Sequence, residues 1–134
     1  MKTPAYDLEE RTACFGEGVI EFCLSLSFHP VTSPIITQWV AASTSVGANY
    51  CEADEAKSKK DFRHKVAICR KESKETKYWL RMIAEAAPAQ KASARELGKE
   101  AKELHLIFCA IIRTTDQNLR KERLAKRPTT GEAV

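Results

Sequence analysis

The sequence predicts an all-α protein, an antiparallel up-down-up-down four-helix bundle. The chain of 134 residues has only five Gly and five Pro, together with long stretches of Ala, Lys, Glu, Arg and Leu, as is typical of helical globular proteins. Apolar residues recur every three or four positions in four segments. Because the connections between these segments are short, neighbouring helices should run antiparallel. A chain of this length forms one ordinary domain and can bury a core.

The first helix is predicted to begin at Asp7 and to end at residues 28–30. Asp7 can cap a helix, and Glu10 follows it at the spacing of a capping box. The sequence Phe-His-Pro at 28–30 stops the helix. Its core-facing positions step by four and three residues, which is the stripe of a bundle helix: Leu8, Thr12, Phe15, Val19, Phe22 and Leu26.

The second helix is predicted to run from Ser33, as its cap, to about Ala56, with Pro34 at the first helical position. No charged side chain occurs between Pro30 and Cys51, although charged residues make up 30% of the chain. A surface helix normally carries a charged face, and this segment is too polar for a membrane span, which needs about 20 mostly apolar residues. We therefore expect both sides of this helix to be covered, one by the core and one by a partner.

Small residues on the second helix predict a close contact with a neighbouring backbone. Ser43 and Gly47 lie four residues apart and therefore share one face. Glycine inside a helix costs about 1 kcal/mol relative to alanine. Close packing at this face is the expected compensation.

Two further capping boxes, Ser58–Asp61 and Ser93–Glu96, predict the starts of the third and fourth helices. The third helix should stop before Pro88, since the residue before a proline avoids helical geometry. Its predicted core positions are Phe62, Val66, Cys69, Ser73, Thr76, Leu80 and Ile83. Those of the fourth helix are Leu97, Ala101, Leu104, Phe108 and Ile111.

The fourth helix is predicted to end near Thr115. This end divides the chain into a bundle domain, 1–115, and a basic C-terminal tail, 116–134. Within the tail, 118–126 is compatible with a frayed helix, and the residues from 127 onward have the composition of a disordered segment.

The cysteines and the N-terminus indicate a cytoplasmic protein. Residues 1–7 lack the apolar core of a signal peptide. The cysteines are odd in number and never spaced as CxxC, so we expect free, buried thiols in a reducing compartment rather than disulfides or zinc. The five are Cys14, Cys23, Cys51, Cys69 and Cys109.

The sequence predicts no catalytic residue, no cofactor and no metal site. Di-iron bundles use Glu-x-x-His pairs, and of the three histidines only His64 follows a carboxylate, Asp61, at that spacing. One such pair does not make a site. No Gly-rich phosphate loop and no nucleophile paired with a base can be recognised. We therefore expect no enzyme activity.

The third helix carries most of the excess positive charge. From Lys57 to Arg81 there are ten Lys and Arg against three acids, a net charge of +7 on one segment of a chain whose total is +4. At about 100° per residue, six of these cations fall within an arc of roughly 60° that is about 33 Å long. This basic stripe consists of Lys59, Arg63, Arg70, Lys74, Lys77 and Arg81.

The sequence leaves three ways to accommodate the basic stripe. Phosphates of a nucleic acid could neutralise it without any readout of base sequence, with help from the basic tail. Alternatively, Glu10, Glu17 and Glu21 face away from the core of the first helix and could meet the stripe of a neighbouring subunit. The third possibility is a solvated face.

Trp39 and Trp79 are expected in the core or in an interface, whereas Tyr78 lies near the stripe and could stack on a base.

Four motifs together resemble a known family. DLEERT at 7–12, SVGANY at 45–50 followed by Glu52-Ala53, SKKDF at 58–62 and KETKYWL at 74–80 occur in the order and spacing of the four-helix bundle proteins named for intervening sequences in 23S ribosomal RNA genes, also called S23 ribosomal proteins. The resemblance covers about 6–115. That family is similar in turn to the accessory proteins of diversity-generating retroelements, which are basic, pentameric bundles that bind a reverse transcriptase and nucleic acid. This chain departs from them in being only weakly basic.

The resemblance implies a homopentameric ring, no catalytic residue, and RNA, DNA or a reverse transcriptase as partner. The structural signature of the family falls on Ser45, Gly47, Asn49, Tyr50 and Glu52. Asn49 and Glu52 either line the lumen of a ring or form hydrogen bonds that fix how the second helix meets the third, and we favour the second interpretation.

The leading hypothesis is a non-enzymatic oligomeric scaffold or adaptor whose basic stripe binds RNA, DNA or a nucleic-acid-processing protein such as a reverse transcriptase. The alternative is a structural, self-assembling bundle whose charged stripes form contacts between subunits.

Overall fold

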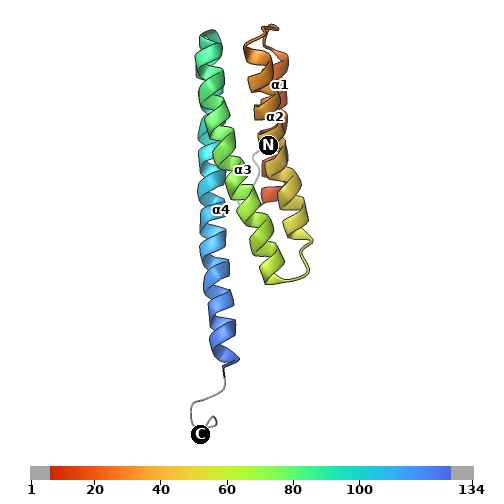
Figure 1. Ribbon diagram of the computed structural model, residues 1–134, viewed down its shortest axis with the longest axis vertical. Helices are drawn as coiled ribbons and strands as arrows, with labels where there is room; N and C mark the ends of the chain where they lie inside the picture. Colours follow the sequence, from red (N-terminus) through yellow and green to blue (C-terminus); the bar gives the residue numbers. More distant parts are fainter. Residues whose placement is uncertain (1–6, 128–134) are drawn as a thin grey trace.

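The computed structural model describes residues 7–127 as an antiparallel bundle of four helices (Figure 1). The helices are α1 (Leu8–Leu24), α2 (Thr32–Asp54), α3 (Lys59–Ala86) and α4 (Lys91–Ala125), and a 3₁₀ turn, η1 (Pro88–Gln90), precedes α4. No strand occurs in the described part of the chain. The predicted fold class, an all-α four-helix bundle, is confirmed.

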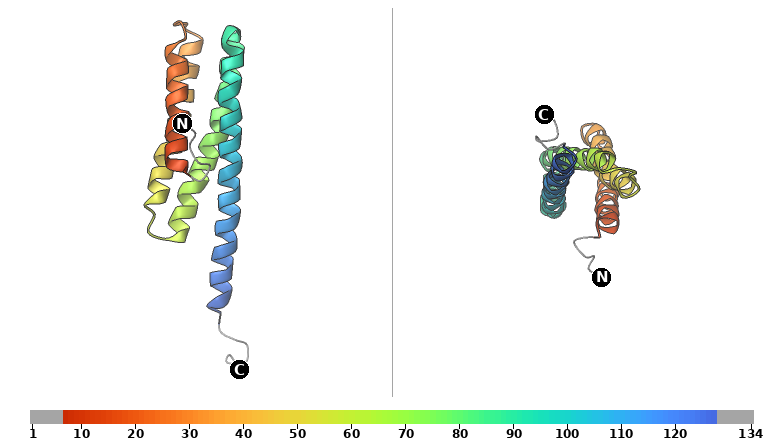
Figure 2. Two further views of the ribbon diagram at one scale, coloured as in Figure 1. Left: turned by 180° about the vertical axis from the view of Figure 1, so that it is seen from behind. Right: turned by 90° about the horizontal axis from the view of Figure 1, so that it is seen from below.

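The helices pack in chain order, with α2 and α3 in the middle and α1 and α4 at the two sides (Figure 2). Among the four pairs of helices that are in contact, α1 and α4 have the fewest contacts. Arg11 links them through two ion pairs. It donates to both carboxylate oxygens of Glu100, from Nε at 2.7 Å and from Nη2 at 2.8 Å. Nη2 also reaches the carboxylate of Glu103 at 3.3 Å.

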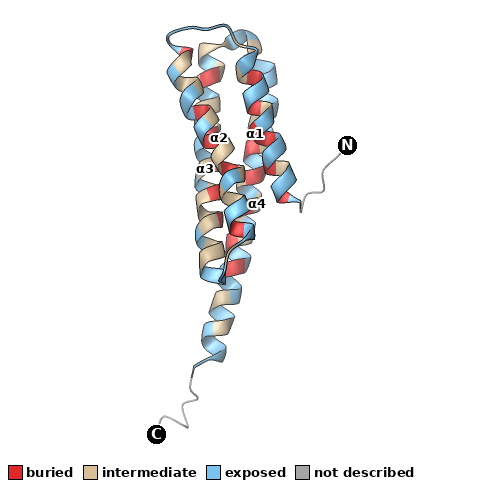
Figure 3. Ribbon diagram, turned by 90° about the vertical axis from the view of Figure 1, so that its right-hand side faces the viewer, coloured by how far each residue is buried: buried red, intermediate tan, exposed pale blue. Residues whose placement is uncertain are grey.

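The core forms where the apolar stripes of the four helices meet (Figure 3). On α1, the predicted positions from Leu8 to Phe22 are buried, and Leu26 packs against them half-buried. The largest buried side chain is Trp39, which meets Phe22 edge-on with ring centroids 5.5 Å apart. The indole N–H of Trp39 has no acceptor among the described residues, and such a buried donor typically costs about 1–3 kcal/mol.

The core predictions for α3 and α4 hold, with some positions half-buried. The buried predicted positions are Val66, Cys69, Ser73, Thr76, Ile83, Ala101, Leu104 and Phe108. The half-buried ones pack around this core: Phe62, Leu80, Leu97 and Ile111.

Two predicted helix caps are confirmed. The Asp7 carboxylate accepts a hydrogen bond from the backbone N–H of Glu10 at 3.3 Å. The Ser58 hydroxyl accepts one from the backbone N–H of Asp61 at 3.0 Å. Both side chains satisfy N–H groups that the first turn of a helix leaves without partners. At its other end α1 stops at Leu24, earlier than predicted.

The predicted start of α2 is wrong, because Ser33 already lies inside the helix. The carbonyl of His29 accepts hydrogen bonds from the backbone N–H of Ser33 at 3.0 Å and from the Thr32 hydroxyl at 3.1 Å. These bonds extend the first turn toward the N-terminus, so that Val31 occupies the cap position without a side-chain bond. The helix ends at Asp54.

Both predicted ends of α4 are wrong as well. Ser93 does not cap the helix, because η1 leads directly into α4 at Lys91. At the other end the helix continues past Thr115 to Ala125, and the boundary drawn between 115 and 116 falls inside a continuous helix. Ion pairs with α3, described below, join this extension to the bundle. Of the predicted tail, 128–134 lies outside the described residues.

The cysteine prediction holds only in part. All five thiols are free, but Cys69 alone is fully buried, whereas Cys14 and Cys51 are exposed. These two lie beside the core-facing stripes rather than on them. Burial raises the pKa of the Cys69 thiol to about 12 and that of Cys23 to about 11, so both thiols stay protonated at neutral pH.

The predicted close approach of backbones occurs where α2 meets α1. A Cβ atom added at Gly47 would lie 3.2 Å from the Thr12 hydroxyl oxygen and 3.5 Å from its carbonyl carbon. The Thr12 hydroxyl cannot easily move, because it donates to the carbonyl of Leu8 at 2.6 Å. At Gly16, by contrast, an added Cβ would lie 3.6 Å from the Thr44 methyl group, an ordinary contact.

These two glycines give a matched test of the packing. Gly16→Ala should raise the free energy of unfolding by about 0.5–1 kcal/mol, the helical advantage of alanine. Gly47→Ala gains the same advantage but compresses Thr12, so its free energy of unfolding should fall at least about 1 kcal/mol below that of Gly16→Ala. Urea unfolding at one protein concentration measures both. Equal stabilisation by the two substitutions would contradict the close approach.

Candidate nucleic-acid interface

The basic stripe runs along α3, and the structure divides it into two parts. Lys59 and Arg63, near the start of α3, form ion pairs with the last turns of α4. Lys59 binds the carboxylate of Glu122. Arg63 donates to both oxygens of the Asp116 carboxylate, from Nε at 2.6 Å and from Nη2 at 3.2 Å. These two cations are thus neutralised within the chain, which is none of the three ways that the sequence left open.

The ion pairs also change the titration of the two acids. The hydrogen bond from Arg63 lowers the pKa of Asp116, and that from Lys59 lowers the pKa of Glu122. Sequence reasoning missed both partners because it assigned them to a separate tail. The predicted antiparallel packing could have identified them, because it places the residues that follow Thr115 beside the first turns of α3.

The second part of the stripe has no such partners. Within the described residues, no carboxylate forms an ion pair with the four remaining cations. We call them the unpaired cations: Arg70, Lys74, Lys77 and Arg81. Burial is the main cause of the lowered pKa of His105 on α4, and the positive charges of Lys77, Lys74 and Arg70 lower it further. Lys77, Lys74 and Arg70 therefore all lie near His105, and its imidazole stays neutral at pH 7.

An exposed aromatic ring lies beside the unpaired cations. Tyr78 is 54% exposed and lies one turn of α3 from both Lys74 and Arg81. It meets the ring of Trp79 edge-on with centroids 5.0 Å apart. The half-buried Trp79 donates from its indole N–H to the carboxylate of Glu75 at 3.2 Å, which holds the neighbour of Tyr78 in place.

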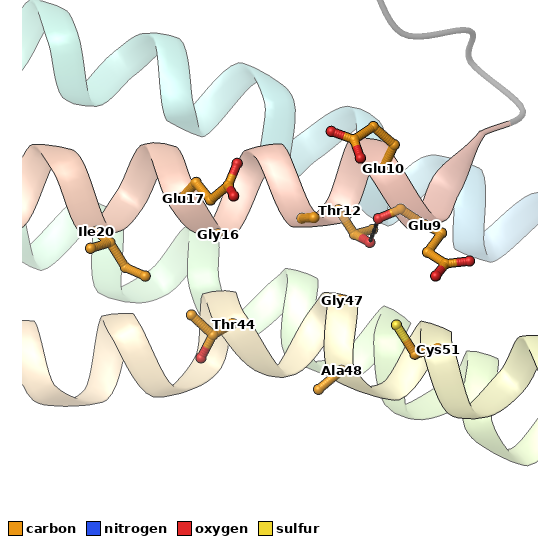
Figure 4. Close-up of a pocket in the computed structure, with 11 residues that line it drawn as sticks. Glu9, Glu10, Thr12, Gly16, Glu17, Ile20, Thr44, Gly47, Ala48 and Cys51 are labelled. Atoms are coloured by element: carbon orange, nitrogen blue, oxygen red, sulfur yellow. Dashed lines mark hydrogen bonds between the residues drawn. The ribbon is translucent and has the colours of Figure 1, made fainter.

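The acidic side chains of α1 border a groove on the opposite side of the molecule. This α1–α2 groove has a volume of about 410 Å³ (Figure 4). Glu9, Glu10 and Glu17 line it from α1, and the residues that line it from α2 are small: Thr44, Gly47, Ala48 and Cys51. Glu21 is exposed but does not line the groove, whereas Glu9 does and was missed. Glu10 also accepts a hydrogen bond from Cys14, which raises the pKa of that thiol.

The signature residues of α2 serve several contacts. Glu52 accepts a hydrogen bond from Lys65 of α3 at 2.6 Å, so it links the two helices. Asn49 instead donates to the carbonyl of Ser45 at 2.9 Å, within α2. Tyr50 packs against Phe108 with ring centroids 6.2 Å apart, and burial raises the pKa of its hydroxyl. Gly47 provides the contact with α1.

The described residues contain no group of three or more His, Cys, Asp and Glu side chains that could hold a metal ion. Between residues 7 and 127, every helix is too short or too polar to span a membrane.

The fold and its charged faces define the chain as a small four-helix bundle that is basic along α3 and acidic along α1. Residues 15–109 match the family of 23S rRNA-intervening sequence proteins, and the chain belongs to this family. A similar solved structure is the crystal structure of a protein of unknown function from the S23 ribosomal protein family of Bacteroides thetaiotaomicron. It is 25% identical, with a TM-score of 0.68 over 78% of this chain and 96% of that chain. A comparison with curated proteins gives no match.

The two ion pairs at the end of α4 can be tested independently of each other. Arg63→Gln should raise the pKa of Asp116 toward its usual range and leave Glu122 unchanged. Lys59→Gln should do the reverse. A lowered carboxylate pKa stabilises the fold above the usual pKa, and this contribution is lost as the pH falls through the lowered value. Each variant lacks this contribution, so it should unfold in acid at a higher pH than the original protein does. Carboxyl NMR titrations measure both pKa values, and a shift at neither acid would contradict the pairing.

Proposed function

We propose that the protein is a non-enzymatic, oligomeric scaffold whose unpaired cations bind the phosphate backbone of RNA or DNA, alone or together with a nucleic-acid-processing protein such as a reverse transcriptase. The observation that carries the proposal is the segment Arg70–Arg81, where four cations share one helix face without a carboxylate partner in the described chain. The similarity to an S23 family protein supports the four-helix bundle that holds these cations on one face.

The charge pattern favours phosphate as the ligand. Like charges that converge on one face repel each other, and a row of phosphates can neutralise them while condensed counterions are released. The segment is about 17 Å long at 1.5 Å per residue. Four phosphate contacts predict that log K falls with log salt with a slope of about −3 for a single strand.

Tyr78 gives the surface a preference for single strands. An exposed aromatic ring beside cations can stack on a base of any identity, which is how many proteins bind single-stranded nucleic acids without reading their sequence. Tyr78 is exposed between Lys74 and Arg81. Binding through this surface should therefore depend on strandedness and salt more than on base sequence.

The outer face of α2 supports self-assembly, which we propose produces a homopentamer in the cytoplasm. Its exposed residues before Cys51 carry no charge: Pro34, Thr37, Gln38, Ala41 and Ala48. An uncharged face loses little hydration when a second copy covers it. In a ring, several copies of the unpaired cations would bind one strand, and avidity would exceed the affinity of a single subunit.

A second candidate function is a structural assembly in which the charged faces meet each other. The α1–α2 groove carries Glu9, Glu10 and Glu17 around an otherwise small-residue lining, and it could receive the unpaired cations of a neighbouring subunit. Complementary charges of this kind fix orientation more than they add affinity.

Mass and RNA binding measured together distinguish the two functions. At about 0.1 M salt, where charges act over about 10 Å, the assembly should bind single-stranded RNA, and at about 1 M it should release the RNA but keep its mass. The triple substitution of Arg70, Lys74 and Lys77 by Glu should abolish RNA binding and leave the mass unchanged. As a matched control, the same substitution of Lys57, Lys60 and Lys71 reverses three charges outside the stripe and should retain most of the binding.

Two results would contradict the proposal. If the triple variant binds RNA as tightly as the original protein, the unpaired cations are not the interface. If high salt or the triple variant dissociates the assembly, and RNA does not bind at low salt, the stripe is a contact between subunits.

A further inference from the structure

A second basic feature lies where α3 and α4 join. Here a cleft of about 180 Å³ opens between the last turns of α3 and the first turns of α4. We call it the α3–α4 cleft. Its lining consists of Lys77, Leu80, Arg81, Ala84, Lys91, Ala94 and Arg95.

The polar lining of the cleft is entirely cationic. Lys77 and Arg81 are four residues apart on α3, and Lys91 and Arg95 are four apart on α4, so each helix presents two cations on one face. No acid lines the cleft. None of the four cations forms an ion pair with a described residue. Because the C-terminus of α3 and the N-terminus of α4 lie together here, the helix dipoles largely cancel, and the side chains determine the potential.

The size and floor of the cleft restrict its ligand. Its volume is below the roughly 300–1,000 Å³ of typical pockets for drug-sized molecules, which leaves room for a small anion and not for a nucleotide. The floor is apolar: Ala94 is buried, and Leu80 and Ala84 are half-buried. Such a floor lowers the local dielectric and strengthens the attraction of the surrounding cations. Lysine and arginine offer several N–H donors each and are the usual partners of phosphate oxygens.

We propose that the α3–α4 cleft binds a phosphate group, as in inorganic phosphate, diphosphate or the phosphorylated end of a nucleic-acid strand. The site lies at one end of the basic stripe, and it adds Lys91 and Arg95, which the stripe does not contain. Only the strand end as a source of the phosphate rests on the proposed function; the cleft itself does not.

Isothermal titration of the full chain with diphosphate at about 0.1 M salt tests the site. Replacing both Lys91 and Arg95 by Gln should weaken binding at least about tenfold, since each charged hydrogen bond lost typically costs that factor. The control replaces Arg120 and Lys121 by Gln, which removes two exposed charges from the far end of α4 and should leave the affinity unchanged. Equal affinities in all three proteins would overturn the proposal.

Gly98→Ala gives a second test that changes no charge. A Cβ atom at Gly98 would lie 2.4 Å from a methyl carbon of Leu80, so the Leu80 side chain must move. Because Leu80 forms part of the floor, the substitution should weaken diphosphate binding while helix content and mass stay the same. Unchanged affinity in this variant and in the Lys91→Gln/Arg95→Gln variant would show that the cleft is not the site.

Oligonucleotides identify the source of the phosphate. A preference for 5′-phosphorylated over 5′-hydroxyl RNA that disappears in the Lys91→Gln/Arg95→Gln variant would support the site and assign it to strand ends. Binding of diphosphate without this preference would support the site for a free anion. Diphosphate binding without any RNA binding would keep the cleft and contradict the proposed function. RNA binding without diphosphate binding or 5′-phosphate preference would overturn the cleft alone.

Discussion

The neutralisation of like charges on α3 is the constraint on which the proposed nucleic-acid surface depends. α4 is the long neighbour of α3, and it brings carboxylates to one end of the stripe only. Asp116 and Glu122 pair with Arg63 and Lys59, and this pairing joins the end of α4 to the start of α3. Farther along, α4 faces the stripe with the neutral His105 and then with Lys91 and Arg95. The unpaired cations therefore lie between the ion-paired start of α3 and the α3–α4 cleft, which Lys77 and Arg81 line.

On the opposite side of the molecule, the close contact of α1 with α2 determines the shape of the α1–α2 groove. Gly47 brings α2 against the Thr12 backbone, and the small residues around it leave the α1–α2 groove open. Glu9, Glu10 and Glu17 then border this groove. The bundle is thus acidic along α1 and basic along α3, while the uncharged face of α2 lies between them. This separation of charge would orient copies of the chain in an assembly.

Local signals in the sequence predicted much of this fold. The caps at Asp7 and Ser58 and the core stripes of α1, α3 and α4 depend on neighbouring residues, and the structure has them as predicted. The predicted end of α4 at Thr115 was wrong, although 118–126 is compatible with a helix, and no local pattern contains the ion pairs that join this part of α4 to α3. The start of α2 failed because the bonds to the His29 carbonyl outweigh the Ser-Pro signal.

The candidate site was predictable only within one helix. The basic stripe follows from the period of α3, but which of its cations find partners depends on α4. Lys91 and Arg95 were missed for the same reason, since a cleft between two helices has no signature on either one. Cys14 and Cys51 were predicted to be buried because cysteine is usually buried, but both are exposed because they lie beside the core-facing stripes of their helices.

Lysine acetylation with and without single-stranded RNA, read by mass spectrometry at about 0.1 M salt, tests the central claim most directly, because charges on the surface still act over about 10 Å there. RNA should slow the acetylation of Lys74 and Lys77 and leave Lys57 and Lys60 nearly unaffected. If Lys74 and Lys77 are already protected without RNA, and become reactive only when the assembly dissociates, the unpaired cations form a contact between subunits and not a nucleic-acid surface.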